Sequence, residues 1–181
     1  MRIYPAIWVI VMALLAGCVN DIKVVNKLTS QTEATQEEAK NLLVVYSSKG
    51  HVKVRVTSPR SIRYIDKGYT EMPEGGHVEF YNDSAVKTSE MWANYGRMYE
   101  KTDQLLARDN VRVVNTKGET LESEELLWDP NTKKISTNRF VKITTAKEII
   151  YGDGLEANRD LSDYKIKKIK GTIHLDNEAV E

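Results

Sequence analysis

Two stretches of sequence decide the fold: residues 111–130 (VRVVNTKGETLESEELLWDP) and residues 140–157 (FVKITTAKEIIYGDGLEA). They share one pattern, so they are predicted to be two copies of the same β-unit. In each copy, an alternating run of apolar and polar residues leads into a polar turn, a second short run and a further turn. Leu121 and Leu126 of the first copy recur as Ile150 and Leu155 at one common offset. A single hairpin cannot bury its own apolar face, so this repeat predicts hairpins that stack on one another.

The rest of the chain after residue 42 also reads as short strands, without a convincing helical period. We predict strands at residues 52–57, 62–65, 78–81, 86–88, 91–99, 164–166 and 169–175. Residues 91–99 could form a helix, but their position after a turn favours a strand. The alternation changes parity across Lys167 and Lys168, which predicts a bulge or a sharp bend there. We therefore expect an all-β fold, either an antiparallel sandwich or an open, curled roll.

Composition excludes several kinds of function. Lysine plus arginine and aspartate plus glutamate both number 26, so no net field attracts nucleic acid. Cys18 is the only cysteine, which excludes an internal disulfide and any zinc cluster built on cysteines. The three histidines, His51, His77 and His174, are far apart in the sequence and are expected to be surface strand residues.

Catalytic motifs are also missing from the sequence. It contains no nucleophile elbow, phosphate-binding loop, zinc-protease helix or dinucleotide fingerprint. Gly152-Asp153-Gly154 is predicted to be a tight turn rather than a phosphate or calcium loop. Glu124 and Glu125 are predicted to lie on a turn, without the apolar pocket that a general acid needs. We expect a protein that is not an enzyme and that needs no cofactor or metal.

The N-terminus is predicted to be an export signal followed by an anchor. Residues 1–17 combine a charged start with a short apolar run that is too short to span a membrane, as in a secretory signal peptide. Leu15-Ala16-Gly17-Cys18 resembles the bacterial lipobox, which implies that Cys18 is lipidated and holds the mature chain on a membrane facing the periplasm. Residues 18–41 are predicted to be a polar tether, with one possible helical turn near Glu37. Residues 42–176 are expected to form the β-domain, and residues 177–181 a polar tail.

Several fragments of this β-domain together resemble one known family. They are residues 46–52 (YSSKGHV), 72–81 (MPEGGHVEFY), 107–111 (ARDNV), 121–129 (LESEELLWD), 134–137 (KIST) and 152–157 (GDGLEA). In order and spacing they are similar to LptC, in its lipoprotein-anchored, Bacteroidota-type form. The resemblance implies an open, twisted β-jellyroll like that of LptA, and transport without catalysis. LptC takes lipopolysaccharide from the inner-membrane transporter of LptB, LptF and LptG, in which LptB hydrolyses ATP, and passes it to LptA.

The resemblance also implies a site and two docking edges. The early edge near residues 52–56 would meet the jellyroll domains of LptF and LptG, and the late edge at residues 164–175 would meet LptA. Both edges carry lysine or arginine, which could equally well protect them from aggregation. The inward positions, taken from strand parity, are the candidate groove residues Val54, Val56, Phe80, Val111, Val113, Leu121, Leu126, Trp128, Val141, Ile143, Ile150, Leu155, Tyr164, Ile166 and Ile173.

Periodicity cannot distinguish a groove from a closed core. A lipid conduit would bind acyl chains at these positions, because each buried CH₂ is worth about 0.8 kcal/mol. The alternative is a structural or glycan-binding periplasmic lipoprotein in which the same residues are plain core.

Overall fold

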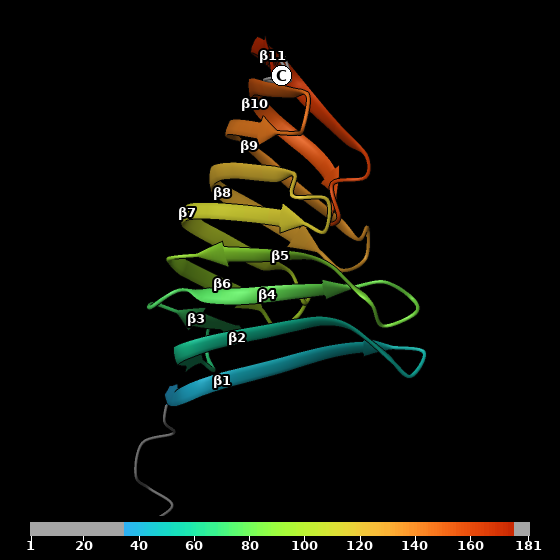
Figure 1. Ribbon diagram of the computed structural model, residues 1–181. Coiled ribbons are helices and arrows are strands. Elements are labelled where there is room, and N and C mark those ends of the chain that lie inside the picture. Colours follow the sequence, from blue (N-terminus) through green and yellow to red (C-terminus); the bar gives the residue numbers. More distant parts are fainter. Residues whose placement is uncertain (1–34, 176–181) are drawn as a thin grey trace, which may run out of the picture. The chain divides into compact units, whose positions relative to one another are not determined.

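The computed structural model describes residues 35–175, and all of the secondary structure in this part of the chain is β-strand (Figure 1). The predicted signal peptide, Cys18, most of the predicted tether and the tail at residues 177–181 lie outside the described residues. All strand pairs are antiparallel. The all-β fold class is therefore confirmed.

Eleven strands make up the described sheet. They are β1 (Gln36–Ser48), β2 (His51–Tyr64), β3 (Tyr69–Met72), β4 (Gly76–Tyr81), β5 (Lys87–Ala93), β6 (Tyr95–Tyr99), β7 (Leu105–Asn115), β8 (Thr120–Asp129), β9 (Lys134–Thr144), β10 (Glu148–Asn158) and β11 (Tyr164–His174). Figure 1 shows them stacked from β1 at one end to β11 at the other. The segment at residues 91–99 is extended, as predicted, and is divided between β5 and β6.

The repeated unit is a pair of hairpins, as the sequence predicted. β7 pairs with β8, β8 with β9, and β9 with β10, so the two copies lie side by side in the sheet. The turn of the first copy is set by Asn115, whose Oδ1 accepts hydrogen bonds from the backbone N–H groups of Lys117 and Glu119. Gly118 lies between them with a φ of 79°, a conformation that glycine adopts without steric cost.

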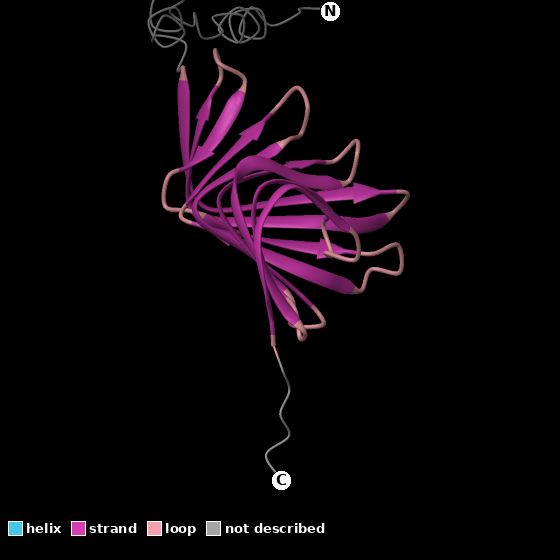
Figure 2. Ribbon diagram, turned by 90° about the horizontal axis from the view of Figure 1, so that it is seen from above, coloured by secondary structure: helices cyan, strands magenta, loops and turns pink. Residues whose placement is uncertain are grey.

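The sheet folds over on itself, because two long strands belong to both of its layers. In β2, Val54–Thr57 pair with β4, whereas Ile62–Tyr64 pair with β3. In β7, the N-terminal half pairs with β6 and the C-terminal half with β5. The ring β2–β4–β5–β7–β6–β3 is thereby closed, with β4 and β5 in one layer and β3 and β6 in the other. Figure 2 shows how successive strands rotate relative to one another around this roll.

Bulges in the middle of the long strands make the fold possible. The register shifts at Asp109 and Asn110 in β7 and at Gly154 in β10, and matching irregularities occur in the middle of β8 and β9. Asp109, Asn110 and Gly154 all have φ near +60 to +75°. Bulges bend a strand sharply, so each long strand turns a corner here and presents apolar residues to the interior from both of its halves.

The core lies between the two layers. The rings of Phe80 in β4 and Trp128 in β8 meet across it, with centroids 5.8 Å apart. Tyr46 in β1 packs edge-on against the same indole at 6.2 Å. These aromatic contacts join the layers near the ends of the strands and add to the hydrophobic burial.

The predicted N-terminal boundary was wrong, because β1 begins at Gln36. Its first residues pair with the end of β2, and Glu38 and Glu37 form ion pairs with Arg60 and Arg63 across the two strands. Residues 36–41 are therefore part of the sheet, and there is no helical turn near Glu37. The predicted early edge near residues 52–56 also lies inside the sheet, since β1 covers it.

Two predicted turns, one in each copy of the repeat, are instead irregular parts of strands. Gly152-Asp153-Gly154 lies within β10, and Glu124 and Glu125 lie within β8, because the strands bend at these points and continue. The bulge predicted at Lys167 and Lys168 in β11 is centred on Lys170, which is the extra residue between Ile169 and Gly171.

Candidate functional site

The predicted groove residues converge on the interior between the layers. Twelve of the fifteen are buried, and none of these exposes more than 8% of its surface: Val54, Val56, Phe80, Val111, Val113, Leu121, Leu126, Trp128, Val141, Ile143, Ile150 and Leu155. They come from β2, β4, β7, β8, β9 and β10, and all but Ile150 belong to one cluster of buried side chains. Strand parity therefore identified the inner face of the roll.

The three candidates in the last strand behave differently. Tyr164 and Ile166 are half-buried and pack against the core, so they lie on the inner face at its open edge. Ile173 is 52% exposed and pairs with Ile149, and it is the neighbouring Thr172 that pairs with the buried Ile150. The assignment of Ile173 to the groove was wrong, because the bulge at Lys170 reverses the parity of the strand beyond it.

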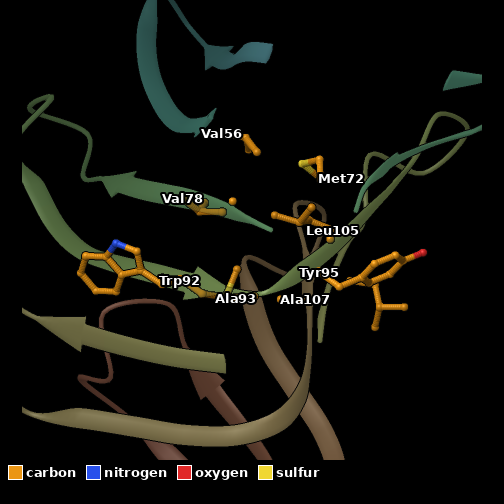
Figure 3. Close-up of a pocket in the computed structure, with 12 residues that line it drawn as sticks. Val56, Met72, Val78, Trp92, Ala93, Tyr95, Leu105 and Ala107 are labelled. Atoms are coloured by element: carbon orange, nitrogen blue, oxygen red, sulfur yellow. The ribbon is translucent and has the colours of Figure 1, made fainter. Parts of the chain in front are cut away.

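The interior is filled by side chains. A cavity of about 20 Å³ remains between Val56, Met72, Val78 and Leu105 (Figure 3). This is roughly the room that one water molecule requires, far less than an acyl chain needs. An apolar ligand can therefore enter only if the layers separate or the edge strands move.

A larger pocket of about 360 Å³ opens where the strand ends of the two layers meet. We call it the mouth. Its apolar wall includes Tyr46 and Trp128, which also contact each other. Four cationic side chains from four different segments also line it, Lys49, Lys53, Lys133 and Arg159, and Asp83 is its one carboxylate. This cluster was not predicted from the sequence, because nothing in the local pattern brings these positions together.

The loop at residues 159–163, between β10 and β11, crosses from one layer to the other beside the mouth. We call it the strap. Arg159 Nη2 donates a hydrogen bond of 2.8 Å to the carbonyl oxygen of Tyr81, and the Ser89 hydroxyl donates one of 2.6 Å to the carbonyl oxygen of Arg159. Asn115 Nδ2 donates to the carbonyl oxygen of Asp160 at 3.0 Å, and Leu161 of the strap is buried in the core. The strap thus ties the strand ends of one layer to those of the other.

A charged network stabilises the outside of β3 and β6. The Tyr95 hydroxyl and Arg97 Nη2 both donate to Glu71 Oε1, at 2.8 and 2.7 Å. Burial raises the pKa of Glu71, but these two hydrogen bonds outweigh it and hold the pKa below its usual value. The Arg97 guanidinium also lies 4.4 Å from the centre of the Tyr69 ring. The network has the partners of a structural ion pair, and its Tyr95 also lines the small apolar cavity between the layers.

The two ends of the described sheet are strand edges. β1 pairs only with β2, and β11 pairs only with β10. Each carries large exposed apolar side chains, Leu43 and Val45 in β1 and Ile169 and Ile173 in β11. The late edge was predicted correctly, and the early edge is β1 rather than the strand that follows it.

Within residues 35–175, no His, Cys, Asp and Glu side chains gather in a group that could hold a metal ion. The same part of the chain has no helix with the length and apolar character needed to cross a membrane. The class of protein is thus an antiparallel β-jellyroll with an apolar interior and two free edges.

The family of LptC-related lipopolysaccharide-assembly proteins matches residues 5–174, and the chain belongs to this family. The resemblance to the LptC family is therefore confirmed, and membership gives the chain a role in lipopolysaccharide transport. The family consists of transport proteins rather than enzymes and works at the periplasmic side of the inner membrane. A comparison with curated proteins returned no match.

Proposed function

We propose that this chain accepts lipopolysaccharide from the inner-membrane transporter of LptB, LptF and LptG and passes it to an LptA-like protein. The observation that carries the proposal is the continuous apolar inner face, which runs through all the long strands to the open edge at β11. Acyl chains gain about 0.8 kcal/mol for each CH₂ that leaves water, so such a face can hold a lipid with several chains.

Access to the inner face requires a conformational change. The interior is filled by its own side chains, and the strap fastens the two layers beside the mouth. Tyr164 and Ile166 in the edge strand are only half-buried, and β11 is held on one side alone. We infer that lipid enters as β11 and the strap move away from the opposite layer.

The free edges supply the docking sites in this proposal. β1 pairs with a strand of the jellyroll domains of LptF or LptG, and β11 pairs with a strand of the LptA-like protein. Unpaired backbone groups at an edge are a ready template for such pairing. The exposed apolar residues of both strands add side-chain contacts to the backbone hydrogen bonds.

Anchoring through a lipidated Cys18, after removal of residues 1–17, is also part of the proposal. It rests on the sequence Leu15-Ala16-Gly17-Cys18. A Cys18→Ala variant should appear in the soluble periplasmic fraction instead of the inner-membrane fraction. If this variant stays with the membrane, another segment anchors the chain.

The filled interior favours one alternative, a structural or glycan-binding lipoprotein with a permanently closed core. A photo-crosslinking amino acid at Ile143, which is 1% exposed, distinguishes the two functions. The conduit predicts that lipopolysaccharide is captured in cells from this position. The matched control is Arg112, which is exposed on β7 and should capture none. Capture from Arg112 alone, or from neither position, would support the closed core.

A further inference from the structure

The mouth brings together four cationic side chains from separate parts of the chain. Lys49 comes from the β1–β2 turn, Lys53 from β2, Lys133 from the β8–β9 turn and Arg159 from the strap. One carboxylate, Asp83, lines the same pocket. Four cations face one anion in a chain whose formal net charge is zero, so the imbalance is local.

Most N–H donors of the Arg159 guanidinium make no hydrogen bond to the described residues. Its guanidinium is half-buried and makes one hydrogen bond, to the carbonyl oxygen of Tyr81. Among residues 35–175, no carboxylate lies within 4.0 Å of it. A guanidinium carries five N–H donors, and burying its charge without an anionic partner is costly. Burial accordingly lowers the pKa of Arg159.

A bulge brings Lys53 into the mouth. Tyr46 of β1 pairs with Val54 and Ser47 pairs with Val52, so Lys53 is the extra residue between them. Bulges re-aim side chains in this way. Lys53 Nζ lies 2.7 Å from Asp83 Oδ1, and the lysine side chain is 12% exposed whereas that of Asp83 is 92% exposed. The carboxylate of Asp83 is thus solvated, whereas the ammonium of Lys53 that it contacts is largely buried. Another anion can therefore replace this carboxylate at Lys53.

The apolar wall of the mouth continues into the core. Trp128 lines the pocket and also contacts Phe80, which is fully buried. The indole Nε1 of Trp128 is buried without a hydrogen-bond partner among the described residues. A ligand that joins an anionic group to an apolar part would therefore find the matching surface for each within one pocket.

We propose that the mouth binds the phosphate of an amphiphile, with Lys49, Lys53, Lys133 and Arg159 as its partners and the Tyr46–Trp128 wall beside its apolar part. Arginine matches phosphate oxygens through paired N–H groups, and lysines add point charges. The proposal rests on the lipid-carrying function above and adds the part of the lipid that the chain recognises first.

The test changes the charge of the mouth in both directions. Lys49 and Lys133 have φ of 52° and 59°, a region that asparagine tolerates, so Lys49→Asn and Lys133→Asn remove charge without backbone strain. Asp83→Asn removes the competing carboxylate at an exposed turn position. The matched control is Lys101→Asn, an exposed turn lysine that does not line the mouth.

Purified full-length protein is titrated with fluorescent lipopolysaccharide that carries its lipid A phosphates and with the same material after dephosphorylation. The phosphorylated lipid should bind about fivefold more weakly to each lysine variant and about fivefold more tightly to Asp83→Asn, as expected for one partly solvated ion pair. Lys101→Asn should bind like the wild type. Affinity for the dephosphorylated lipid should be weaker overall and the same in all variants.

Inorganic phosphate separates the two possible sources of the anion. If millimolar phosphate displaces the lipid, and does so with the same order of affinities among the variants, the phosphate group alone is recognised. Absence of competition, with the variant effects intact, shows that the headgroup needs its attached lipid. Both results support the site.

Equal binding of the phosphorylated and dephosphorylated lipids by every variant would overturn the anion site and leave lipid carriage intact. If the wild type binds neither lipid, the lipid-carrying function itself is wrong.

Discussion

Arg159 and Tyr81 are joined across the two layers of the roll, by a hydrogen bond of 2.8 Å from the guanidinium of one to the backbone carbonyl of the other. The two residues are 78 positions apart in the chain. Together with the bond from the Ser89 hydroxyl to the Arg159 carbonyl, this contact fastens the strap beside the mouth. A roll that must open for a lipid would do so by breaking these bonds.

Ser89→Ala should loosen the strap while leaving the charge of Arg159 in place. Ser89 is 2% exposed, and its loss leaves the Arg159 carbonyl without that donor, at a cost of about 1 kcal/mol. Hydrogen exchange of the amides at residues 159–163 should be faster than in the wild type. Ser84→Ala is the control, because Ser84 is exposed and its hydroxyl makes no hydrogen bond among the described residues. Unchanged exchange in Ser89→Ala would mean that this bond does not hold the strap.

Two substitutions of Trp128 should differ sharply. Trp128→Ala leaves a cavity beside Phe80 and Tyr46 and should lower the free energy of unfolding by about 4 kcal/mol. Trp128→Phe keeps an aromatic ring there and removes a buried N–H that has no partner, so the loss should be about 1 kcal/mol. Urea denaturation measures both. A loss of about 2 kcal/mol or more in Trp128→Phe would show that the indole N–H has a hydrogen-bond partner in solution.

Gly152→Ala should push β11 away from β10. An added Cβ would lie 2.4 Å from Ile166 Cγ2 and 2.5 Å from the carbonyl oxygen of Lys168, both too close for a carbon atom. Overpacking of this kind costs about 1–3 kcal/mol. Gly171→Ala in the neighbouring strand is the matched control, because nothing lies within 4 Å of its added Cβ. Thermal unfolding should show a loss for Gly152→Ala alone.

Ile173→Arg should weaken docking at the late edge without harming the fold. The side chain is 52% exposed, so the free energy of unfolding should change by about 0.5 kcal/mol at most. Loss of its apolar contact should weaken binding to an LptA-like partner about tenfold, as measured by calorimetry. Ile65→Arg, at a position 46% exposed in the β2–β3 turn, should bind as the wild type does. Normal binding by Ile173→Arg would place the docking surface elsewhere.

Stability should fall at low pH partly through Glu71. The pKa of this carboxyl is lower in the folded chain than its ordinary value of 4.5, so the ionised form stabilises the fold above that pH. This contribution is lost as the pH falls from about 4.5 through the folded-state pKa. Glu71→Gln should therefore cost about 2 kcal/mol at neutral pH, with a smaller difference from wild type in acid.

Urea denaturation at pH 7 and at successive lower pH values measures this difference. Glu124→Gln, at an exposed position with no ion pair among the described residues, should follow the wild type at every pH. A Glu71→Gln loss that stays constant with pH would mean that the carboxylate charge does not matter.

The strands and the inner face were predictable because alternation is a local property. Leu121, Leu126 and their counterparts in the second copy show their inward direction within a few residues, and each is buried as expected. Ile173 was misplaced because one extra residue, Lys170, reverses the pattern, whereas the parity change in the sequence placed the bulge at Lys167 and Lys168.

Other features depend on partners that are distant in sequence. The polar start of β1 forms a strand because its backbone pairs with β2 and its glutamates form ion pairs with two arginines of β2. These partners cannot be inferred from residues 36–40 alone. The mouth collects Lys49 and Arg159 from opposite parts of the chain for the same reason. Whether the interior is filled likewise depends on how the two layers pack against each other. Alternation shows which residues point inward but does not show how closely the layers pack.

The corners in the middle of the long strands have one more consequence. Because each strand turns through both halves of the roll, the terminal strand at either end offers a neighbour a bent rim instead of a straight border. If a protein of the same fold paired one of its strands with such a bent edge strand, that single pairing would extend both layers of the roll. Its apolar inner face would then continue this one, and once both rolls open, a fatty tail could pass from one to the other without meeting water.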